Sequence, residues 1–263
     1  MSFDLFKNMQ SLVISLKTAV ERRKHIEHQF TIKGVDFQFF DALTPEKAKP
    51  LAEKMSLTVK NECLTSGELA CFMSHVSIWQ KIVDEKIPYL AIFEDDVFLG
   101  KNATEVLNSY TWIQPEWDII KVEAFAETVL AGRKYTNILD KETEVFQLKS
   151  KNLGTAGYIL SLNGAQQYLR YIRENALIPL DEMIFDNFLK LNILNIYQLN
   201  PAICIQEMKL YPQKSVLSSD LLSERKLRMS KNKKKAKDKV KHELIRIVTQ
   251  LKLALFGKKI YFK

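Results

Sequence analysis

Short apolar runs and segments of helical periodicity alternate along the chain. "SLVISL" (11–16) is a short apolar run that predicts a strand. The next segment, 18–34, predicts a helix, because Thr18 is a capping residue and Gly34 is a common helix terminator. "VDFQFFDA" (35–42) alternates apolar and polar positions, as strands do. The first 42 residues are therefore predicted to form a β-α-β unit.

The clearest helical pattern lies between Ser66 and Lys86. One apolar stripe, with spacings of three and four residues, is formed by Leu69, Phe72, Val76, Trp79 and Val83. Pro88 ends this pattern. "YLAIF" (89–93) follows and is apolar at every position, which predicts a strand buried on both faces of a sheet.

Later segments continue the alternation of strands and helices. Three further strands are predicted at 117–125, 153–161 and 196–207. Two further helices are predicted: "GAQQYLRYI" (164–172), with Asn163 as its cap, and "LDEMIFDNFLKLN" (180–192). Strands that alternate with helices predict an α/β protein.

Charge divides the chain into two parts. The net charge is +8, but residues 225–263 carry 15 Lys and Arg against two acids, a net of +13. The other residues carry 24 basic and 29 acidic side chains, a net of −5. We therefore predict an acidic body over residues 1–223 and a basic C-terminal segment over 224–263.

The basic segment contains an amphipathic helical pattern. In "KVKHELIRIVTQLKLALF" (239–256) one helical face would hold Val240, Leu244, Ile247, Val248, Leu251 and Leu255. An apolar face flanked by lysines predicts peripheral binding to an anionic membrane surface. The alternative is a helix that packs this face on the body. Nucleic-acid binding is disfavoured, because the basic segment lacks interleaved aromatics and the body is acidic.

Composition favours a protein of the cytoplasm. No run approaches the roughly 18 apolar residues of a membrane span, and the N-terminus lacks the pattern of a signal peptide. The three cysteines show no CxxC spacing, which favours reduced thiols.

Three consecutive acids, Glu94, Asp95 and Asp96, directly follow the apolar strand 89–93. Ligands of open α/β sheets bind at the carboxyl ends of strands, and carboxylates there suit Mg²⁺ or Mn²⁺ together with phosphate oxygens. The chain has no GxGxxG or GxxxxGK[ST] loop, so metal and side chains would have to neutralise a phosphate. Because strand residues alternate in direction, we expect Glu94 and Asp96 to act together while Asp95 points elsewhere, unless the chain has already turned. The alternative is a solvated strand end.

Seven blocks of the sequence together resemble glycosyltransferase family 25. In chain order they are "VISLKTAVERRKHI", "FFDAL", "GELACFMSHVSIWQKI", "LAIFEDDVFL", "LGTAGYILSLNGAQQYL", "PLDEMIFD" and "AICIQE" with its later "SSD". They span residues 13–220 in one consistent order. Any single block is a weak signal, whereas the ordered set is specific.

The resemblance implies a fold and an activity. The implied fold is a GT-A-like, Rossmann-type mixed sheet flanked by helices, here followed by the basic helical tail. The implied activity is inverting, metal-dependent transfer of galactose from UDP-galactose to a lipooligosaccharide outer-core sugar, on the inner face of the bacterial inner membrane. The alternatives are a glucosyl- or N-acetylhexosaminyltransferase, or a membrane- or polyanion-binding adaptor without catalysis.

The resemblance also assigns site residues. The expected ligands of Mn²⁺ or Mg²⁺ are Asp96 and Glu94. The expected base is Asp181, with Asp186 as the alternative, although acids at a helix start are also favoured by the helix dipole. The expected donor-binding residues are Ser15, Leu16, Arg22, Glu68, Ser74, His75, Glu94, Asp95, Gly154, Thr155 and Gly157. For several of these a structural role is the alternative: a helical His in the core, a Glu near a helix start, glycines at a strand entry.

Overall fold

The computed structural model describes residues 8–60, 62–139, 143–213 and 236–263. The predicted boundary near Ser223 and the run of lysines before residue 236 lie outside these ranges. So does the "SSD" of the last sequence block.

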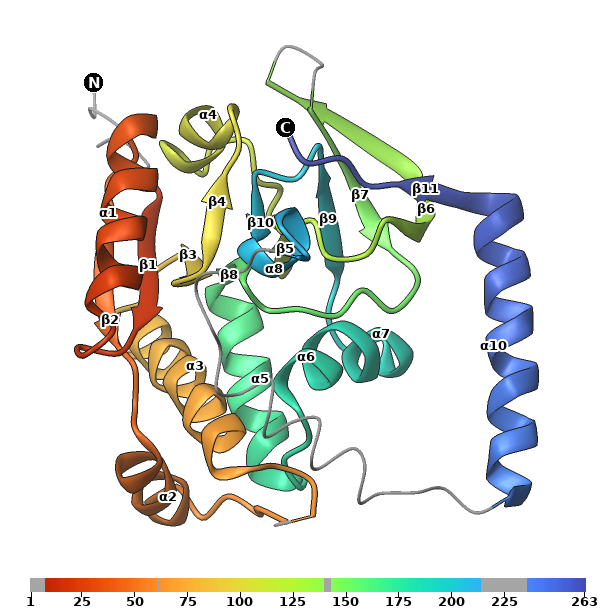
Figure 1. The fold of residues 1–263 in the computed structure, drawn as a ribbon, viewed down its shortest axis with the longest axis horizontal. Coiled ribbons are helices and arrows are strands. Elements are labelled where there is room, and N and C mark those ends of the chain that lie inside the picture. The colour runs from red at the N-terminus through yellow and green to blue at the C-terminus, as the bar shows by residue number, and fades with distance from the viewer. Residues whose placement is uncertain (1–7, 61, 140–142, 214–235) are drawn as a thin grey trace.

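A mixed sheet forms the centre of the protein (Figure 1). Its strands, in chain order, are β1 (Gln10–Ser15), β2 (Gln38–Asp41), β3 (Tyr89–Glu94), β5 (Ile119–Lys121), β6 (Thr128–Ile138), β7 (Thr143–Leu148), β8 (Gly157–Ser161), β9 (Ile196–Asn200) and β11 (Gly257–Lys259). Their spatial order is β11-β6-β7-β9-β5-β8-β3-β1-β2. β1 runs parallel to β2 and β3, while β8 runs antiparallel to its neighbours β3 and β5. A separate antiparallel pair is formed by β4 (Val97–Leu99) and β10 (Cys204–Gln206).

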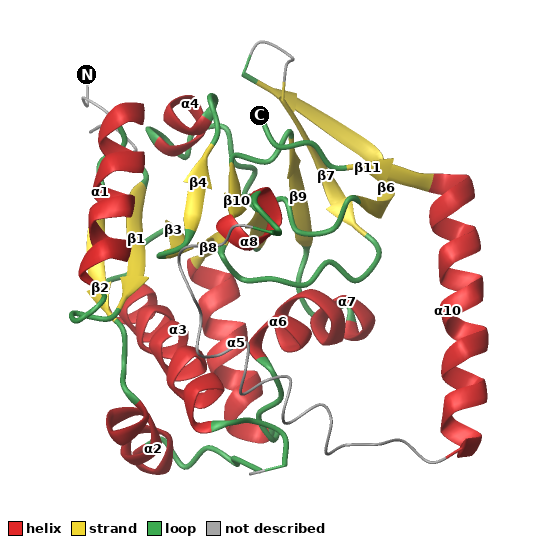
Figure 2. Cartoon of the chain, viewed as in Figure 1, coloured by secondary structure: helices red, strands yellow, loops and turns green. Residues whose placement is uncertain are grey.

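Helices lie beside the sheet (Figure 2). They are α1 (Val20–Lys33), α2 (Pro45–Lys54), α3 (Ser66–Asp84), α4 (Ala103–Leu107), α5 (Leu162–Glu174), α6 (Leu180–Glu182), a π-helical turn (Met183–Asn187), α7 (Phe188–Leu191), α8 (Glu207–Leu210) and α10 (Ala236–Phe256). The predicted α/β class, a mixed sheet flanked by helices, is confirmed.

Alternating strand residues build two cores. In β3, Leu90 and Ile92 join the cluster that includes residues of α2, α3 and α5. Ala91 and Phe93 join the cluster that includes residues of α1 and α4. The period of two along a strand explains why "YLAIF" is apolar throughout, since both of its faces are covered.

The predicted β-α-β start is confirmed, with one correction. α1 ends at Gly34, whose φ of 60° is left-handed, as a glycine terminator requires. The helix starts at Val20 after Ala19, however, and no side chain caps it, so the prediction for Thr18 is wrong. A capping box forms instead at α3, where Thr65 and Glu68 exchange side-chain and backbone hydrogen bonds.

Several predicted elements are shorter than their sequence patterns. The strand predicted at 117–125 pairs with β9 only over Ile119–Lys121, because the following Val122 hydrogen-bonds to the segment 203–204 instead. The strand predicted at 196–207 divides into β9 and β10 around Pro201, which lacks an N–H. α5 is capped by the Ser161 hydroxyl, not by Asn163, and the helix predicted at 180–192 contains a π-helical turn.

The end of the chain returns to the sheet. α10 confirms the helix predicted near the C-terminus, and Figure 1 shows it along the outer side of the molecule. After α10, β11 pairs antiparallel with β6, which the sequence pattern did not predict. The backbone N–H of Lys101 also donates to the carbonyl of Lys263 over 3.0 Å. Across the described ranges, none of the helices combines the length and the hydrophobicity that a membrane span requires.

Candidate functional site

The acidic triplet lies where β3 ends, and β3 is an interior strand between β8 and β1. Glu94 is the last residue of β3, and its N–H donates to the carbonyl of Ala156 over 3.0 Å. Asp95 and Asp96 form the turn that leads to β4. Because β1 and β3 are parallel, the end of β1 at Ser15 lies at the same edge of the sheet. The predicted position at the carboxyl ends of strands is thus the observed one.

Asp95 is bound from the side of β1 and α1. Its Oδ2 accepts a hydrogen bond of 2.7 Å from the Ser15 hydroxyl, and its Oδ1 forms an ion pair of 2.5 Å with Arg22. Both carboxylate oxygens of Asp95 therefore have a protein partner. Leu16, the next residue after β1, has an exposed side chain, and its carbonyl accepts from Arg23 over 3.1 Å.

Glu94 and Asp96 carry strongly perturbed carboxyl groups. Burial and the charge of Asp96 raise the pKa of Glu94 to about 8, against the hydrogen bond of 2.6 Å that its Oε1 accepts from Thr155. Burial raises the pKa of Asp96 to about 6, against the opposing charge of Arg22. The side-chain amide of Gln206 lies 3.3 Å from Asp96 Oδ2. Clustered, desolvated carboxylates of this kind favour a cation among them.

More acids surround Cys71 of α3. Burial raises the pKa of its thiol, and so do the charges of Glu94, Asp181, Asp96 and Glu68, in that order. These acids come from three separate sequence blocks.

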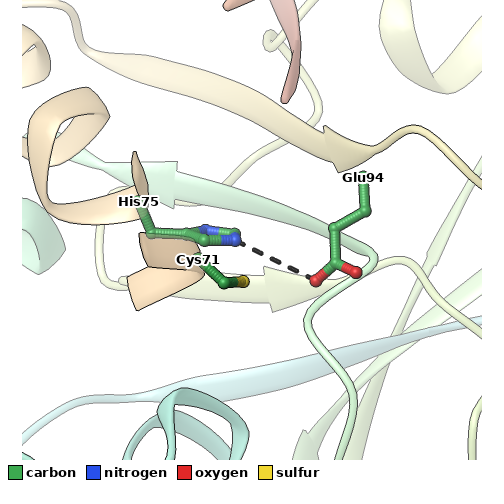
Figure 3. A group of neighbouring side chains, drawn as sticks. All are labelled: Cys71, His75 and Glu94. Carbon is green, nitrogen blue, oxygen red and sulfur yellow. Dashed lines mark ion pairs between the residues drawn. The ribbon is translucent and has the colours of Figure 1, made fainter. Parts of the chain in front are cut away.

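His75 lies one helical turn from Cys71 and points toward Glu94 (Figure 3). The ring is fully buried, and its Nε2 is 3.9 Å from Glu94 Oε1, beyond hydrogen-bond length. On the other side, Nδ1 is 2.7 Å from the hydroxyl of Tyr158, which also accepts from Trp79 Nε1 over 3.1 Å. Burial lowers the pKa of His75 to about 3, so the ring is neutral at physiological pH.

A buried ion pair lies next to the triplet and was missed in the sequence. Lys121 Nζ is 2.7 Å from Glu123 Oε2 and 2.5 Å from the carbonyl of Gly154, and both side chains are fully buried. Gly154 has a φ of 87°, and a Cβ there would lie 2.7 Å from the Glu123 carboxylate. The available signal was a Lys and a Glu two residues apart in an apolar strand, which places them on one face.

Three predicted donor-binding residues have structural contacts. Ser74 accepts from the N–H of Leu43 over 2.9 Å and so fixes the segment after β2. Glu68 closes the capping box of α3. Gly157 lies where a Cβ would collide with the Cys204 sulfur, so its small size is required by packing. Any contact of these three with a donor remains a prediction.

Asp181 and Asp186 differ in their surroundings. Asp181 is buried at the start of α6, and its Oδ1 accepts from the N–H of Glu182 over 2.9 Å. Asp186 lies in the π-helical turn and forms ion pairs with Lys190 at 2.8 Å and Lys151 at 3.7 Å. The carboxylate of Asp186 is thus occupied by two lysines, whereas that of Asp181 is buried at a helix start.

The carboxylates fit a hard divalent cation. Glu94 and Asp96 supply the oxygen atoms that Mg²⁺ and Mn²⁺ prefer. Within the described part of the chain, Glu94 Oε2 has no hydrogen bond, while Oε1 is held by Thr155. The buried Glu123 adds to the negative charge that acts on Glu94.

Comparison with known proteins agrees with the resemblance of the sequence blocks. Residues 8–184 match the family model described as "Glycosyltransferase family 25 (LPS biosynthesis protein)". The chain is 36% identical to the lipooligosaccharide biosynthesis protein lex-1 of Haemophilus influenzae, over 95% of this chain and 93% of that protein. It is 39% identical to the lacto-N-neotetraose biosynthesis glycosyltransferase LgtE of Neisseria meningitidis serogroup B, over 82% of each.

A third relative and one solved structure complete the comparison. The chain is 36% identical to the glycosyltransferase LgtB of Neisseria gonorrhoeae, over 92% of each. A glycosyltransferase involved in glycosylation of the major capsid of PBCV-1 aligns with a TM-score of 0.43 and 10% identity, over 76% of this chain and 92% of that chain.

Proposed function

The chain belongs to glycosyltransferase family 25, and from this we propose that it transfers galactose from UDP-galactose to a lipooligosaccharide outer-core sugar, with inversion at the anomeric carbon. The observation that carries the proposal is the pair Glu94 and Asp96, two buried carboxyl groups with raised pKa values at the carboxyl end of an interior strand. A diphosphate with its divalent cation balances such a cluster.

Asp96 and Glu94 would hold Mn²⁺ or Mg²⁺. The cation supplies Lewis-acid stabilisation of the charge that develops on the leaving diphosphate. Arg22 of α1 reaches the triplet, where it fixes Asp95 and adds positive charge beside the acids. In a GT-A-like arrangement, the donor would lie along this edge, next to Ser15, Leu16, Gly154 and Thr155.

Asp181 is the proposed base. The acceptor hydroxyl oxygen bonds to the anomeric carbon as the bond from that carbon to the diphosphate oxygen breaks. The hydroxyl proton passes to Asp181, and the electron pair of the broken bond leaves with UDP. A single displacement inverts the anomeric configuration. The buried position of Asp181 at the start of α6 supports this role, whereas the ion pairs of Asp186 with two lysines argue against Asp186.

α10 supports a membrane-facing surface. Ile247, Val248, Leu251 and Leu255 are between 45% and 72% exposed, so the alternative in which this face packs on the body is not supported. The net charge of +13 over residues 225–263 selects an anionic surface. We propose that this helix binds the inner face of the inner membrane peripherally and brings the site to lipid-linked acceptors.

Metal-dependent turnover tests the activity. The purified full chain is incubated with a panel of UDP-sugars and truncated lipooligosaccharides, with Mn²⁺ or with a chelator, and product linkage is determined by NMR. We expect transfer from UDP-galactose that is lost with the chelator. A preference for UDP-glucose or a UDP-N-acetylhexosamine would reassign the donor. Absence of turnover with every UDP-sugar would favour a non-catalytic adaptor.

A further inference from the structure

The Cys71–His75–Glu94 cluster resembles a metal site in its residue types. One thiol, one imidazole nitrogen and one carboxylate oxygen lie within 4.8 Å of one another, and His75 Nε2 is buried without a hydrogen-bond partner in the described structure (Figure 3). A buried polar atom without a partner requires an explanation. As an acceptor, Nε2 would bind a thiophilic cation. As a donor, it would bind a ligand oxygen. The protonation of the ring decides between these two.

The hydroxyl of Tyr158 determines that protonation. Trp79 Nε1 can only donate, so the Tyr158 oxygen accepts from it. The hydroxyl proton of Tyr158 then has one acceptor within reach among the described residues, which is His75 Nδ1 at 2.7 Å. If Nδ1 accepts, the proton of the neutral ring is on Nε2.

The opposite tautomer leaves more buried groups unpaired. With the proton on Nδ1, both the Tyr158 hydroxyl proton and the Nε2 lone pair lack partners. With the proton on Nε2, only that N–H lacks one. Each unpaired buried group is costly, so the second arrangement is preferred.

A neutral N–H donor next to a carboxylate acceptor can bind one hydroxyl group, because a hydroxyl both accepts and donates a hydrogen bond. Nε2 and Glu94 Oε1 are 3.9 Å apart, so one oxygen that displaces the atoms now covering Nε2 would lie within hydrogen-bond length of both. A hydroxyl can accept from Nε2–H and donate to Oε1 at once, which a phosphate oxygen cannot do. Thr155 fixes Oε1 from another direction over 2.6 Å.

We propose that His75 and Glu94 form a two-sided subsite for one hydroxyl of the donor sugar, with Trp79 and Tyr158 as positioning residues that hold His75 in the Nε2–H tautomer. This inference rests on the proposed function, because it names the sugar as the ligand. Such a subsite discriminates between hexoses that differ in the direction of one hydroxyl, since a missing or misdirected hydroxyl leaves Nε2–H unpaired.

The tautomer is tested without any substrate. The four histidines are labelled with ¹⁵N for NMR spectroscopy. The ring signals of His75 are those that disappear from the spectrum of the His75→Gln variant. We expect the Nε2–H pattern in the metal-free protein. Tyr158→Phe keeps the ring that stacks on His75 but removes the hydroxyl, so the Nδ1–H form should increase. Tyr168→Phe is the matched control, because this buried hydroxyl has no partner in the described structure, and it should leave the pattern unchanged.

The hydroxyl is tested with deoxy donors. UDP-sugars lacking one hydroxyl at a time are compared on the wild type, His75→Gln and His75→Leu. One deoxy sugar should lose about tenfold to a hundredfold in kcat/KM with the wild type. With His75→Leu that sugar and the parent should react equally, and His75→Gln, whose amide N–H can reach the place of Nε2–H, should restore part of the difference.

Two results would overturn the proposal. The first is an Nδ1–H ring whose Nε2 signal shifts on addition of Zn²⁺, which would make the cluster a cation site. The second is an equal loss for every deoxy sugar in the wild type and in His75→Leu. Both are distinct from failure of the proposed function, which would appear as a wild type that turns over no UDP-sugar.

Discussion

Arg22 of α1 and Asp95 form an ion pair of 2.5 Å that joins the first helix of the chain to the turn after β3. Both side chains are largely buried, and the Ser15 hydroxyl binds the second oxygen of Asp95. The middle acid of the triplet is thereby committed to a protein contact. Glu94 and Asp96 on either side of it carry the raised pKa values. This division of roles separates the effects expected of the three acids.

Asp95→Asn should destabilise the protein more than it impairs the chemistry. The substitution removes the charge of the carboxylate 2.5 Å from a largely buried guanidinium, which we expect to cost about 1–3 kcal/mol. Denaturant unfolding measures this cost. The double variant Arg22→Gln/Asp95→Asn should recover part of it, whereas simple additivity of the two losses would contradict a direct pair.

Asp96→Asn should reduce metal-dependent transfer far more than Asp95→Asn does. Asp96 and Glu94 are the proposed metal ligands, so we expect a loss of at least about a hundredfold, together with weaker binding of UDP in the presence of Mn²⁺. Initial rates and calorimetric titration check both effects. Equal activities of the Asp95 and Asp96 variants would refute the assignment.

The stability of the metal-free protein should fall as pH rises from about 5 to about 8. Glu94 and Asp96 have folded pKa values of about 8 and about 6, above their ordinary values, so the folded state retains protons that the unfolded chain has released. A fall of 1 kcal/mol corresponds to about 2–4 °C in thermal midpoint for a protein of this size. Because Mn²⁺ must displace these protons, it should raise the midpoint more at pH 8 than at pH 6.

Glu94→Gln is the control for this pH effect. It removes the group with the larger shift and should flatten the decline. A midpoint of the metal-free wild type that rises over the same pH range would contradict the assigned shifts.

Asp181→Asn should nearly abolish transfer while nucleotide binding survives. Loss of a general base typically lowers the rate by about 10²–10⁴-fold. Asp186→Asn is the matched control, because it removes a carboxylate from the following turn of the chain. This variant should retain activity within about tenfold, because the Asp186 oxygens form ion pairs with Lys190 and Lys151. Single-turnover rates and UDP titration separate the two steps. Full transfer by Asp181→Asn would move the base elsewhere.

The Lys121–Glu123 pair should be far more sensitive to single than to double substitution. Both side chains are fully buried, so Lys121→Met leaves an uncompensated carboxylate and should cost about 3–5 kcal/mol. In Lys121→Met/Glu123→Gln no charge is left unpaired, and much of the stability should return. Denaturant unfolding of the three variants provides the measurement, and a double variant no more stable than Lys121→Met would argue against a dominant charge effect.

Polar substitutions on α10 should weaken binding to anionic vesicles. Ile247→Ser, Leu251→Ser and Leu255→Ser remove exposed apolar side chains without disturbing the core. Point variants are preferable to truncation, because β11 after the helix pairs with β6 of the sheet. Gln250→Ser, at an exposed polar position of the same helix, is the control. Flotation with anionic and neutral vesicles decides, and unchanged binding of the triple variant would exclude this surface.

Much of the fold follows from local patterns. The apolar stripe from Leu69 to Val83 predicted α3, because burial of one helix face requires apolar residues at helical spacing. The apolar run before Glu94 predicted β3, because both faces of that strand are buried. β6 and β11 show no such pattern. β6 is largely polar, with exposed residues at its middle, and β11 is three residues long. Such strands are stabilised by partners distant in the chain rather than by their own composition.

The sequence by itself determined the family, the α/β class and the position of the acids at a strand end. Those features depend on local order along the chain: a strand, a helix, a motif. Only the tertiary structure decided which partner each of these side chains contacts. Arg22 forms an ion pair with Asp95, Thr155 donates a hydrogen bond to Glu94, and Tyr158 hydrogen-bonds to His75. These contacts join residues about 60 to 80 positions apart in the chain. Hydrogen-bond partners and desolvation depend on packing between elements, so neither can be read from the residues of one motif.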